Sequence, residues 1–115
     1  MDCALLNFLS DNDLDLTSTL RERNTSIICK IPFRQTRMMS TVVIKHQESP
    51  DLVRVFCKGA PDILFNKSIR RINLEGNIVE LTEDERISIY KEFVTERIYK
   101  RGLKGIAIGY KDLTN

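Results

Sequence analysis

The sequence predicts an α+β domain in which helices flank an antiparallel sheet. Two observations carry this prediction. Short runs rich in β-branched residues are separated by clusters of turn residues, which is typical of strands joined as hairpins. One longer segment after Thr82 has apolar residues at helical spacing and a cap at its start. Hairpin-connected strands with helices to one side or after them are typical of the α+β class.

The N-terminal segment predicts a short helix and then a polar stretch. Asp2 can cap a helix that extends to Leu9, and residues 10–23 favour a loop with some helix. Within this stretch, an acidic set mimics the ligand spacing of a calcium-binding EF-hand loop: Asp11, Asp13, Asp15 and Glu22. The sixth place is Leu16, where such a loop needs glycine for its sharp turn. An acidic solvated loop is therefore the favoured interpretation, and no metal site is predicted.

Three β-branched runs bounded by turn residues predict strands. They cover residues 27–31, 39–45 and 52–56. Pro32 is expected to end the first strand, because proline cannot donate a backbone hydrogen bond, and residues 33–38 are expected to form a charged bend. The turn cluster 46–51 joins the second run to the third, so these two strands are predicted to form a hairpin.

The second half of the chain predicts helices around a further hairpin. A short helix is expected over residues 61–66, with Pro61 in its first turn. Residues 69–74 and 78–81 flank Glu75-Gly76-Asn77, a favourable hairpin turn.

Thr82 begins the clearest helix, because Thr82 and Glu85 form a capping box. Its apolar side is expected to consist of Ile87, Tyr90, Val94 and Ile98, with Phe93 beside them. Gly102 is expected to end this helix, and residues 103–113 to form a last strand with Ile106 and Ile108 on one face.

Composition limits the classes of function. The 115 residues suffice for one domain with one core, and the net charge of +2 is too small to indicate nucleic-acid binding. Three cysteines without a CxxC pair favour reduced thiols in a cytosolic setting. No apolar run approaches the roughly 20 residues that cross a bilayer, and no signal peptide is predicted. The abrupt opening of the chain suggests a fragment of a larger protein.

The segment Cys57-Lys58-Gly59-Ala60-Pro61-Asp62 is the most informative stretch for function. A lysine at a strand end is followed by a glycine that lets a ligand approach the backbone, and by a proline suited to the first turn of a helix. This cationic, open corner suits an anionic or aromatic ligand. A plain strand-to-helix turn that carries a lysine explains the same residues.

Two further segments offer ligand contacts. Phe33 can stack on a purine and Arg34 or Arg37 can pair with a phosphate, although a core ring with solvated arginines fits the pattern equally well. Lys104, beside a glycine, can reach a phosphate, but a surface lysine is the simpler interpretation. The chain contains no P-loop, no dinucleotide-binding motif and no convincing nucleophile–base set, so no catalytic residue is predicted. His46, in a predicted turn, is expected to be solvated.

Four segments follow one another in the order of a known family. They are DCALLNF at residues 2–8, FRQTRMMS at 33–40, KGAPD at 58–62 and RGLKGIAI at 101–108. They resemble the TECALLxF, FxSxRKxMS, KGAPE and GLRxxAxA motifs of the nucleotide-binding domain of P-type cation-transporting ATPases, and residues 110–113 continue the similarity. The cysteine before Ala-Leu-Leu and the final strand are most similar to calcium pumps of the plasma-membrane type.

The resemblance implies that six residues contact ATP: Asp2, Phe33, Arg37, Lys58, Gly59 and Lys104. Phe33 would stack on adenine, Lys58 would line the same pocket, and Gly59 would let the base and ribose approach the backbone. Asp2 replaces a glutamate that contacts the adenine edge and is one methylene shorter. Lys104 replaces an arginine near the phosphates, which keeps the charge and loses the forked geometry.

Arg37 has two correspondences, because its segment is one residue shorter than the family motif. Counted back from Met39-Ser40, Arg37 takes the place of the family's lysine; counted forward from Phe33, it takes the place of the arginine. The serine that follows the phenylalanine in the motif is not preserved.

The resemblance implies that residues 1–115 are the ATP-binding part of a larger pump that transports cations, and calcium in particular. The phosphorylated aspartate of the family's DKTGT motif is absent from the sequence, as are the hinge, actuator and membrane parts. The module would then position Mg-ATP for phosphoryl transfer to an aspartate in another domain. Its partners would be the phosphorylation and actuator domains, in the cytoplasmic part of an integral membrane protein.

The isolated chain is expected to bind ATP weakly and not to hydrolyse it.

Two other functions stay open. One is a nucleic-acid or phosphoprotein binding module that uses an aromatic and basic set: Phe33, Arg34, Arg37, Arg70 and Arg71. The other is an α+β fragment without a ligand site of its own.

Overall fold

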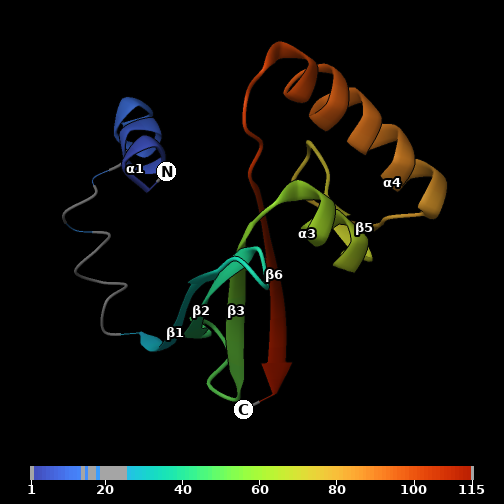
Figure 1. Cartoon of the computed structure of the whole chain (residues 1–115). Coiled ribbons are helices and arrows are strands. Elements are labelled where there is room, and N and C mark those ends of the chain that lie inside the picture. The colour runs from blue at the N-terminus through green and yellow to red at the C-terminus, as the bar shows by residue number, and fades with distance from the viewer. Residues whose placement is uncertain (1, 14, 16–17, 19–25, 115) are drawn as a thin grey trace.

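A computed structural model describes residues 2–13, 15, 18 and 26–114 (Figure 1). The strands in these ranges are β1 (Ile27–Arg34), β2 (Met39–Lys45), β3 (Leu52–Gly59), β4 (Arg70–Ile72), β5 (Ile78–Glu80) and β6 (Ala107–Thr114). Four of them form an antiparallel sheet in the order β1-β2-β3-β6, and β4 and β5 form a separate two-stranded sheet. The predicted α+β class with an antiparallel sheet is confirmed.

The helical elements lie before, between and after these strands. They are α1 (Asp2–Asp11), α3 (Pro61–Lys67), α4 (Glu83–Ile89), the π-helical η1 (Tyr90–Glu96) and the 3₁₀-helical η2 (Tyr99–Arg101). The predicted loop at residues 10–23 lies largely outside the described residues, as do Leu16 and Glu22 of the EF-hand comparison. No described helix has both the length and the apolar character needed to span a membrane.

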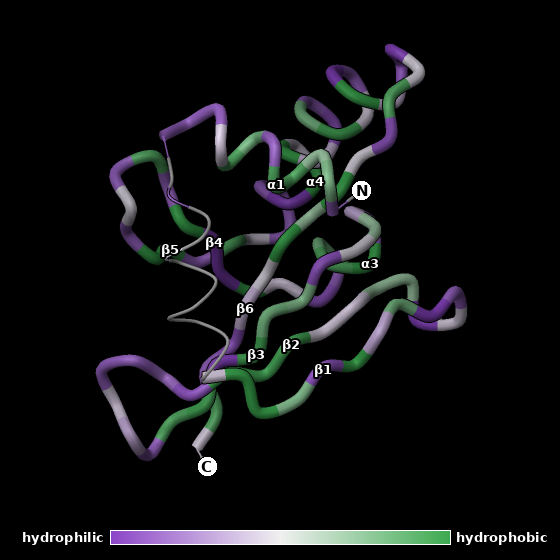
Figure 2. Tube along the Cα trace, turned by 90° about the vertical axis from the view of Figure 1, so that its left-hand side faces the viewer, coloured by the Kyte–Doolittle hydropathy of each residue, from purple (hydrophilic) through white to green (hydrophobic). Residues whose placement is uncertain are grey.

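β3 is one of the two inner strands of the larger sheet. Its pairing with β2 is unbroken from Met39↔Gly59 to Lys45↔Val53, and its pairing with β6 is unbroken from Leu52↔Thr114 to Gly59↔Ala107. Every residue of β3 is buried or half-buried. The prediction ended this strand three residues too early, at Phe56, so Lys58 and Gly59 belong to the strand itself. Figure 2 shows hydrophobic residues along much of β2 and β3 and hydrophilic residues in the turn that joins these two strands.

The expectation that Pro32 ends the first strand is wrong. β1 continues to Arg34, and Phe33 belongs to the strand instead of the bend. Proline is tolerated because β1 is an edge strand and its pairing with β2 shifts register between Ile31 and Arg34. The bend is shorter than predicted; it is closed by Met38 N–H, which donates to the Arg34 carbonyl at 2.8 Å.

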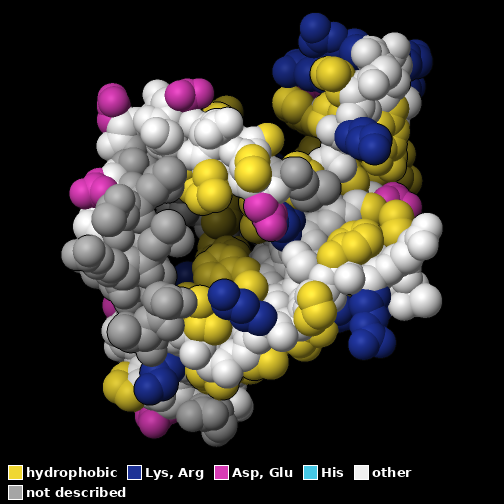
Figure 3. All heavy atoms as spheres, turned by 60° about the vertical axis from the view of Figure 1, so that its left-hand side comes forward, with side chains coloured by type: hydrophobic (Ala, Val, Ile, Leu, Met, Phe, Trp, Pro, Cys, Tyr) yellow, Lys and Arg dark blue, Asp and Glu magenta, His cyan; other side chains and the backbone are white. Residues whose placement is uncertain are grey.

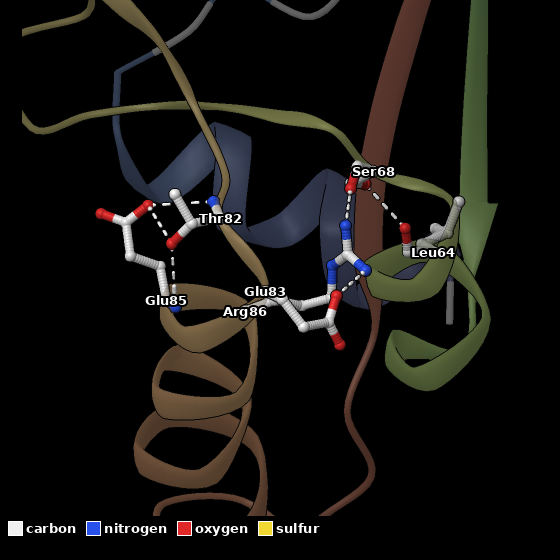
Figure 4. Close-up of polar contacts among 6 residues, drawn as sticks. All are labelled: Leu64, Ser68, Thr82, Glu83, Glu85 and Arg86. Carbon is white, nitrogen blue, oxygen red and sulfur yellow. Dashed lines mark hydrogen bonds and ion pairs between the residues drawn. The ribbon is translucent and has the colours of Figure 1, made fainter.

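The capping box at Thr82 is confirmed (Figure 4). The Glu85 backbone N–H donates to Thr82 Oγ1 at 3.3 Å, and the Thr82 backbone N–H donates to Glu85 Oε2 at 3.1 Å. Arg86 Nη2 also donates to the Ser68 carbonyl at 2.7 Å, which fastens the start of α4 to the end of α3 (Figure 4). The polar contacts at this junction therefore fix where the helix begins.

The chain after this helix differs from the prediction in one respect. Gly102 ends the helical region with a left-handed φ of 71°, as expected, but the last strand begins only at Ala107. Ile106 lies before the strand, so the expected shared strand face with Ile108 is wrong. The Leu103 N–H donates to the Ile98 carbonyl at 3.1 Å, which keeps residues 103–106 folded against the helix end instead of the sheet.

The core is small. Four described hydrophobic residues have a tenth or less of their surface exposed: Ile44, Leu64, Leu81 and Val94. The ring of Phe65 packs edge-on against that of Tyr90 with centroids 5.6 Å apart. This ring contact joins α3 to η1.

Candidate functional site

One end of the larger sheet holds a row of paired residues around Lys58. Lys58 pairs with Ser40 on β2 and with Ile108 on β6. Residues directly opposite one another in antiparallel strands point to the same face, so these three side chains share one face of the sheet. This set, Ser40, Lys58 and Ile108, is called the Lys58 row below. Ile108 is largely exposed, so this part of the face is open.

Phe33 lies on the edge strand β1, at the same end of the sheet as the Lys58 row. The register shift between Ile31 and Arg34 adds one residue to β1, so Pro32 and Phe33 both fall opposite Ser40. Phe33 and Lys58 therefore lie at the same end of the sheet, separated by β2 alone, or roughly 10 Å between their strands. The Phe33 residue is 55% exposed, which rules out a core role and leaves the ring available for stacking.

Asp2 is joined to the Lys58 row by an ion pair. Its carboxylate accepts a hydrogen bond from Lys58 Nζ, although the two residues are 56 positions apart in the chain. This hydrogen bond, and then the charge of the ammonium, lower the pKa of Asp2 below its ordinary value. The start of α1 is thus placed at the same end of the sheet as Phe33 and Lys58.

The face on this side of the molecule is hollowed. Figure 3, which brings the α1 side of the molecule forward, shows hydrophobic side chains gathered in a hollow with acidic and basic side chains beside it. A mixed surface of this kind suits a ligand with an aromatic part and charged groups.

Gly59 is buried and is required by its own neighbours. A Cβ atom at this position would lie 2.2 Å from the Met38 carbonyl oxygen and 2.9 Å from the Met39 Cα. The close approach of the β1–β2 turn therefore explains the glycine without any ligand. The contact of Gly59 with a base or ribose stays a prediction.

Arg37 and Lys104 are placed differently from one another. Arg37 Nη2 donates to the Pro32 carbonyl at 2.6 Å, so its guanidinium folds back over the turn that carries Phe33. This hydrogen bond does not decide whether Arg37 corresponds to the lysine or to the arginine of the family motif. Lys104 is exposed, three positions before Ala107, which pairs with Gly59. The Cα of Lys104 therefore lies within about 11 Å of the Cα of Ala107, at the end of the sheet that carries Lys58.

Sequence reasoning missed an aromatic and charged strip on the same sheet face. Phe56 pairs with Tyr110 directly behind the Lys58 row, with ring centroids 6.1 Å apart. The guanidinium carbon of Arg54 lies 4.4 Å from the centre of the Tyr110 ring. The sequence does show that residues 54, 56 and 58 alternate along one strand and therefore share one face. Which residues of β6 lie beside them can be known only from the register of the two strands.

Arg54 is held by a two-pronged ion pair. Its Nε and Nη2 donate to the two carboxylate oxygens of Asp112 at 2.7 and 2.8 Å, and this hydrogen bonding lowers the pKa of Asp112. His46 Nε2 lies 3.1 Å from Arg54 Nη2. The His46 side chain is 14% exposed, so the expectation of a solvated histidine is wrong. A cavity of about 200 Å³ beside this cluster is lined by Ile44, His46, Gln47, Glu48, Arg54 and Phe56.

The aromatic and basic residues of the alternative binding module are divided between the two sheets. Arg70 and Arg71 belong to the β4–β5 hairpin, and Phe33 and Arg34 belong to β1 of the other sheet. Arg71 Nη2 also lies 3.6 Å from Glu85 Oε1, so its charge is compensated. Among the described residues, no group of three or more His, Cys, Asp or Glu side chains is arranged to hold a metal ion.

Comparison with known proteins places the whole chain in one family. The family model described as "P-type ATPase, cytoplasmic domain N" matches residues 1–115. Plasma membrane calcium-transporting ATPase 1 of Mus musculus is 28% identical over 112 residues, which are 96% of this chain and 9% of that protein.

Two further relatives extend this similarity. A calcium-transporting ATPase of Bacillus subtilis is 28% identical over 92 residues, or 80% of this chain and 10% of that protein. Plasma membrane calcium-transporting ATPase 4 of Bos taurus is 29% identical over 116 residues, or 99% of this chain and 9% of that protein. The chain thus spans about a tenth of the length of these curated relatives. The chain belongs to the family of cytoplasmic N domains of P-type ATPases.

Proposed function

We propose that this chain is the ATP-binding module of a calcium-transporting P-type pump. It would position Mg-ATP so that the γ-phosphate reaches an aspartate in another domain of the same pump. The names of the relatives support calcium as the transported ion, and their greater length supports further domains as partners. In this role the module is the cytoplasmic part of a membrane protein, and residues 1–115 are the ATP-binding domain within it.

One observation carries the proposal: an exposed aromatic ring and a lysine lie level with one another at one end of the sheet. Phe33 is 55% exposed, and Lys58 is separated from it by the single strand β2. The adenine of ATP has a flat face that can stack on the ring, and its ring nitrogens are acceptors for the ammonium of a lysine that lines the same pocket. Asp2 reaches the same place through its ion pair with Lys58.

The remaining proposed contacts surround this pair. Gly59 follows Lys58, and any contact with the nucleotide would be through its backbone, because Met38 and Met39 fill the space where a side chain would stand. Lys104 precedes β6 at the same end and is exposed, so its ammonium is available to the phosphates. Arg37 would act through the turn that holds Phe33, because it is bonded to the Pro32 carbonyl.

The chain's own residues would bind and orient the nucleotide, and the chemistry would take place elsewhere. The sequence has no DKTGT aspartate and no convincing nucleophile–base set, so its contribution to the rate would come from positioning. The isolated chain is accordingly expected to bind ATP weakly and not to turn it over. Sustained ATP hydrolysis by a pure sample would contradict this assignment.

The test is a titration of the isotope-labelled 115-residue chain with ATP, followed by NMR. Shifts should cluster at Asp2, Phe33, Lys58 and Lys104, and ATP should bind more tightly than CTP. Phe33→Ala should weaken ATP binding by roughly 1–3 kcal/mol, the usual loss for a base–aromatic stack. Phe93→Ala is the matched control, since Phe93 is an exposed ring on η1 and should leave affinity unchanged.

Two other results would reject the proposal. Steep salt-dependent binding of oligonucleotides, with shifts at Arg70 and Arg71, would favour the basic binding module. Absence of any shift with ATP would favour a domain fragment without a ligand site.

A further inference from the structure

The β4–β5 hairpin has one exposed face. Exposure alternates along both strands, so the residues of one face are exposed and those of the other face are half-buried. On the half-buried face, Arg71 Nη2 lies 3.6 Å from Glu85 Oε1 of α4. The exposed set, called the hairpin face below, consists of Arg70, Ile72, Ile78 and Glu80.

The hairpin face is apolar toward its turn. Ile72 and Ile78 are directly opposite one another, and each is 56% exposed. Leu74, in the turn beyond them, is fully exposed. Contiguous exposed apolar side chains with charged residues at their border are typical of a surface that binds another protein. The hairpin face is therefore a candidate interaction surface.

The charges of the hairpin face indicate which partner it fits. Arg70 and Glu80 are directly opposite one another across the strands. Among the described residues, however, neither takes part in an ion pair. They line a hollow of about 440 Å³ together with Ile69, Leu81 and Thr82. Both charges are thus available to a partner, and the hollow offers room for a long side chain beside them.

This pattern is complementary to itself. If two hairpin faces are stacked about a twofold axis that runs parallel to the strands, β4 of each copy lies over β5 of the other copy. Arg70 then meets the partner's Glu80, and Ile72 meets the partner's Ile78, and each contact occurs twice. A twofold axis across the strands would instead place Arg70 over the partner's Ile72. Only the first arrangement matches charge with opposite charge and apolar with apolar side chains.

We propose that the hairpin face is a self-association surface, through which two copies of this chain form a twofold dimer. Four isoleucines form its centre, and two ion pairs between Arg70 and Glu80 form its border. The face is small beside the roughly 800 Å² per partner of a standard interface, so the dimer is weak and depends on concentration. The proposal does not rest on ATP binding, because Phe33 and Lys58 belong to the other sheet.

The test is analytical ultracentrifugation of charge-swap variants. Arg70→Glu places two acids against one another at each border, and Glu80→Arg places two bases there. Each variant alone should associate roughly tenfold more weakly than wild type, because two attractive pairs become repulsive. An equal mixture of the two should associate like wild type, since one copy supplies both acids and the other both bases. Lys111→Glu is the matched control, because it makes the same charge change at an exposed residue of β6 and should have no effect.

The apolar centre is tested by a second pair of variants. Ile72→Ser should weaken self-association by at least about tenfold, because the lost apolar contact occurs twice in the dimer. Ile87→Ser is the matched control: Ile87 is 59% exposed, close to the 56% of Ile72, but lies on α4. In NMR spectra, dilution of wild type should shift the signals of Ile72, Leu74 and Ile78.

Three results would overturn the inference. The first is wild type that stays monomeric from about 10 μM to 1 mM, the range in which weak association is measured. The second is a mixture of Arg70→Glu and Glu80→Arg that associates no better than either variant alone. Since mixing cannot rescue a misfolded variant, restored association would have no explanation in folding. The third is an equal loss of association in Lys111→Glu, which would show a general effect of net charge.

Discussion

Replacing Gly59 by alanine tests how the sheet end is built. The new Cβ would lie 2.2 Å from the Met38 carbonyl oxygen, whereas carbon–oxygen contacts normally stay beyond about 3.3 Å, so the backbones must separate by about 1 Å. Met39 Cα and Cβ, both 2.9 Å away, block a sideways shift. The separation also threatens the hydrogen bond from Ala60 N–H to the Met38 carbonyl at 3.1 Å.

The expected loss can be worked from these contacts. Overpacking costs about 1–3 kcal/mol, and one lost backbone hydrogen bond costs about 0.5–1.5 kcal/mol. Gly59→Ala should therefore lower the free energy of unfolding by about 2–4 kcal/mol. For a domain of this size, the melting temperature should fall by roughly 4 °C for each kcal/mol.

Gly109→Ala is the matched control for this change. Gly109 lies on the neighbouring strand β6, and a Cβ there would meet nothing within 4 Å. Its effect on urea unfolding, followed by circular dichroism, should stay within about 1 kcal/mol of wild type. If the two variants unfold at the same urea concentration, the argument from backbone approach is wrong. If Gly59→Ala keeps full stability and loses only ATP binding, the glycine serves the ligand instead.

Two further predictions concern the contacts that hold the fold. Thr82→Ala removes the side-chain half of the capping box and should lower the free energy of unfolding by about 0.5–2 kcal/mol, measured by urea unfolding; an unchanged midpoint would show that the cap carries no stability. The pKa of Asp112 is lowered by its hydrogen bonds from Arg54, so its contribution to stability is present above the ordinary value of 3.8 and is lost as pH falls through the lower folded value. Asp112→Asn should therefore be less stable than wild type at neutral pH, and the difference should shrink in unfolding experiments at strongly acidic pH; a constant difference would contradict this linkage.

Local sequence signals were sufficient for most of the elements. The capping box at Thr82, the proline at the start of α3 and the left-handed Gly102 each act within a few residues, and each appears as predicted. The misplaced strand ends have a different cause. Pro32 stays in a strand because β1 is at the sheet edge, and residues 103–106 stay out of one because Leu103 bonds to Ile98. Both depend on tertiary neighbours that the local pattern does not contain.

The candidate site could be predicted only as separate segments. The family resemblance named Asp2, Phe33 and Lys58, but it did not show how they meet. The ion pair of Asp2 with Lys58 joins residues that are 56 positions apart in the chain. The position of Phe33 opposite Ser40 depends on an extra residue in β1. The Arg54–Asp112–His46 cluster was missed because its members meet only through the β3–β6 register and the turn before β3.

The strands and the helix that carry the residues of the proposed site differ in rigidity. Lys58 lies on an inner strand that is paired without interruption on both sides, so its backbone position is fixed. Phe33 lies on an edge strand, within a register shift, and Asp2 lies on a helix with no buried side chain. A ligand at this sheet end would therefore meet one fixed cation, while the ring and the carboxylate can adjust around it. Because ordering such movable groups costs conformational entropy, the free domain should bind ATP less tightly than its contacts alone would suggest.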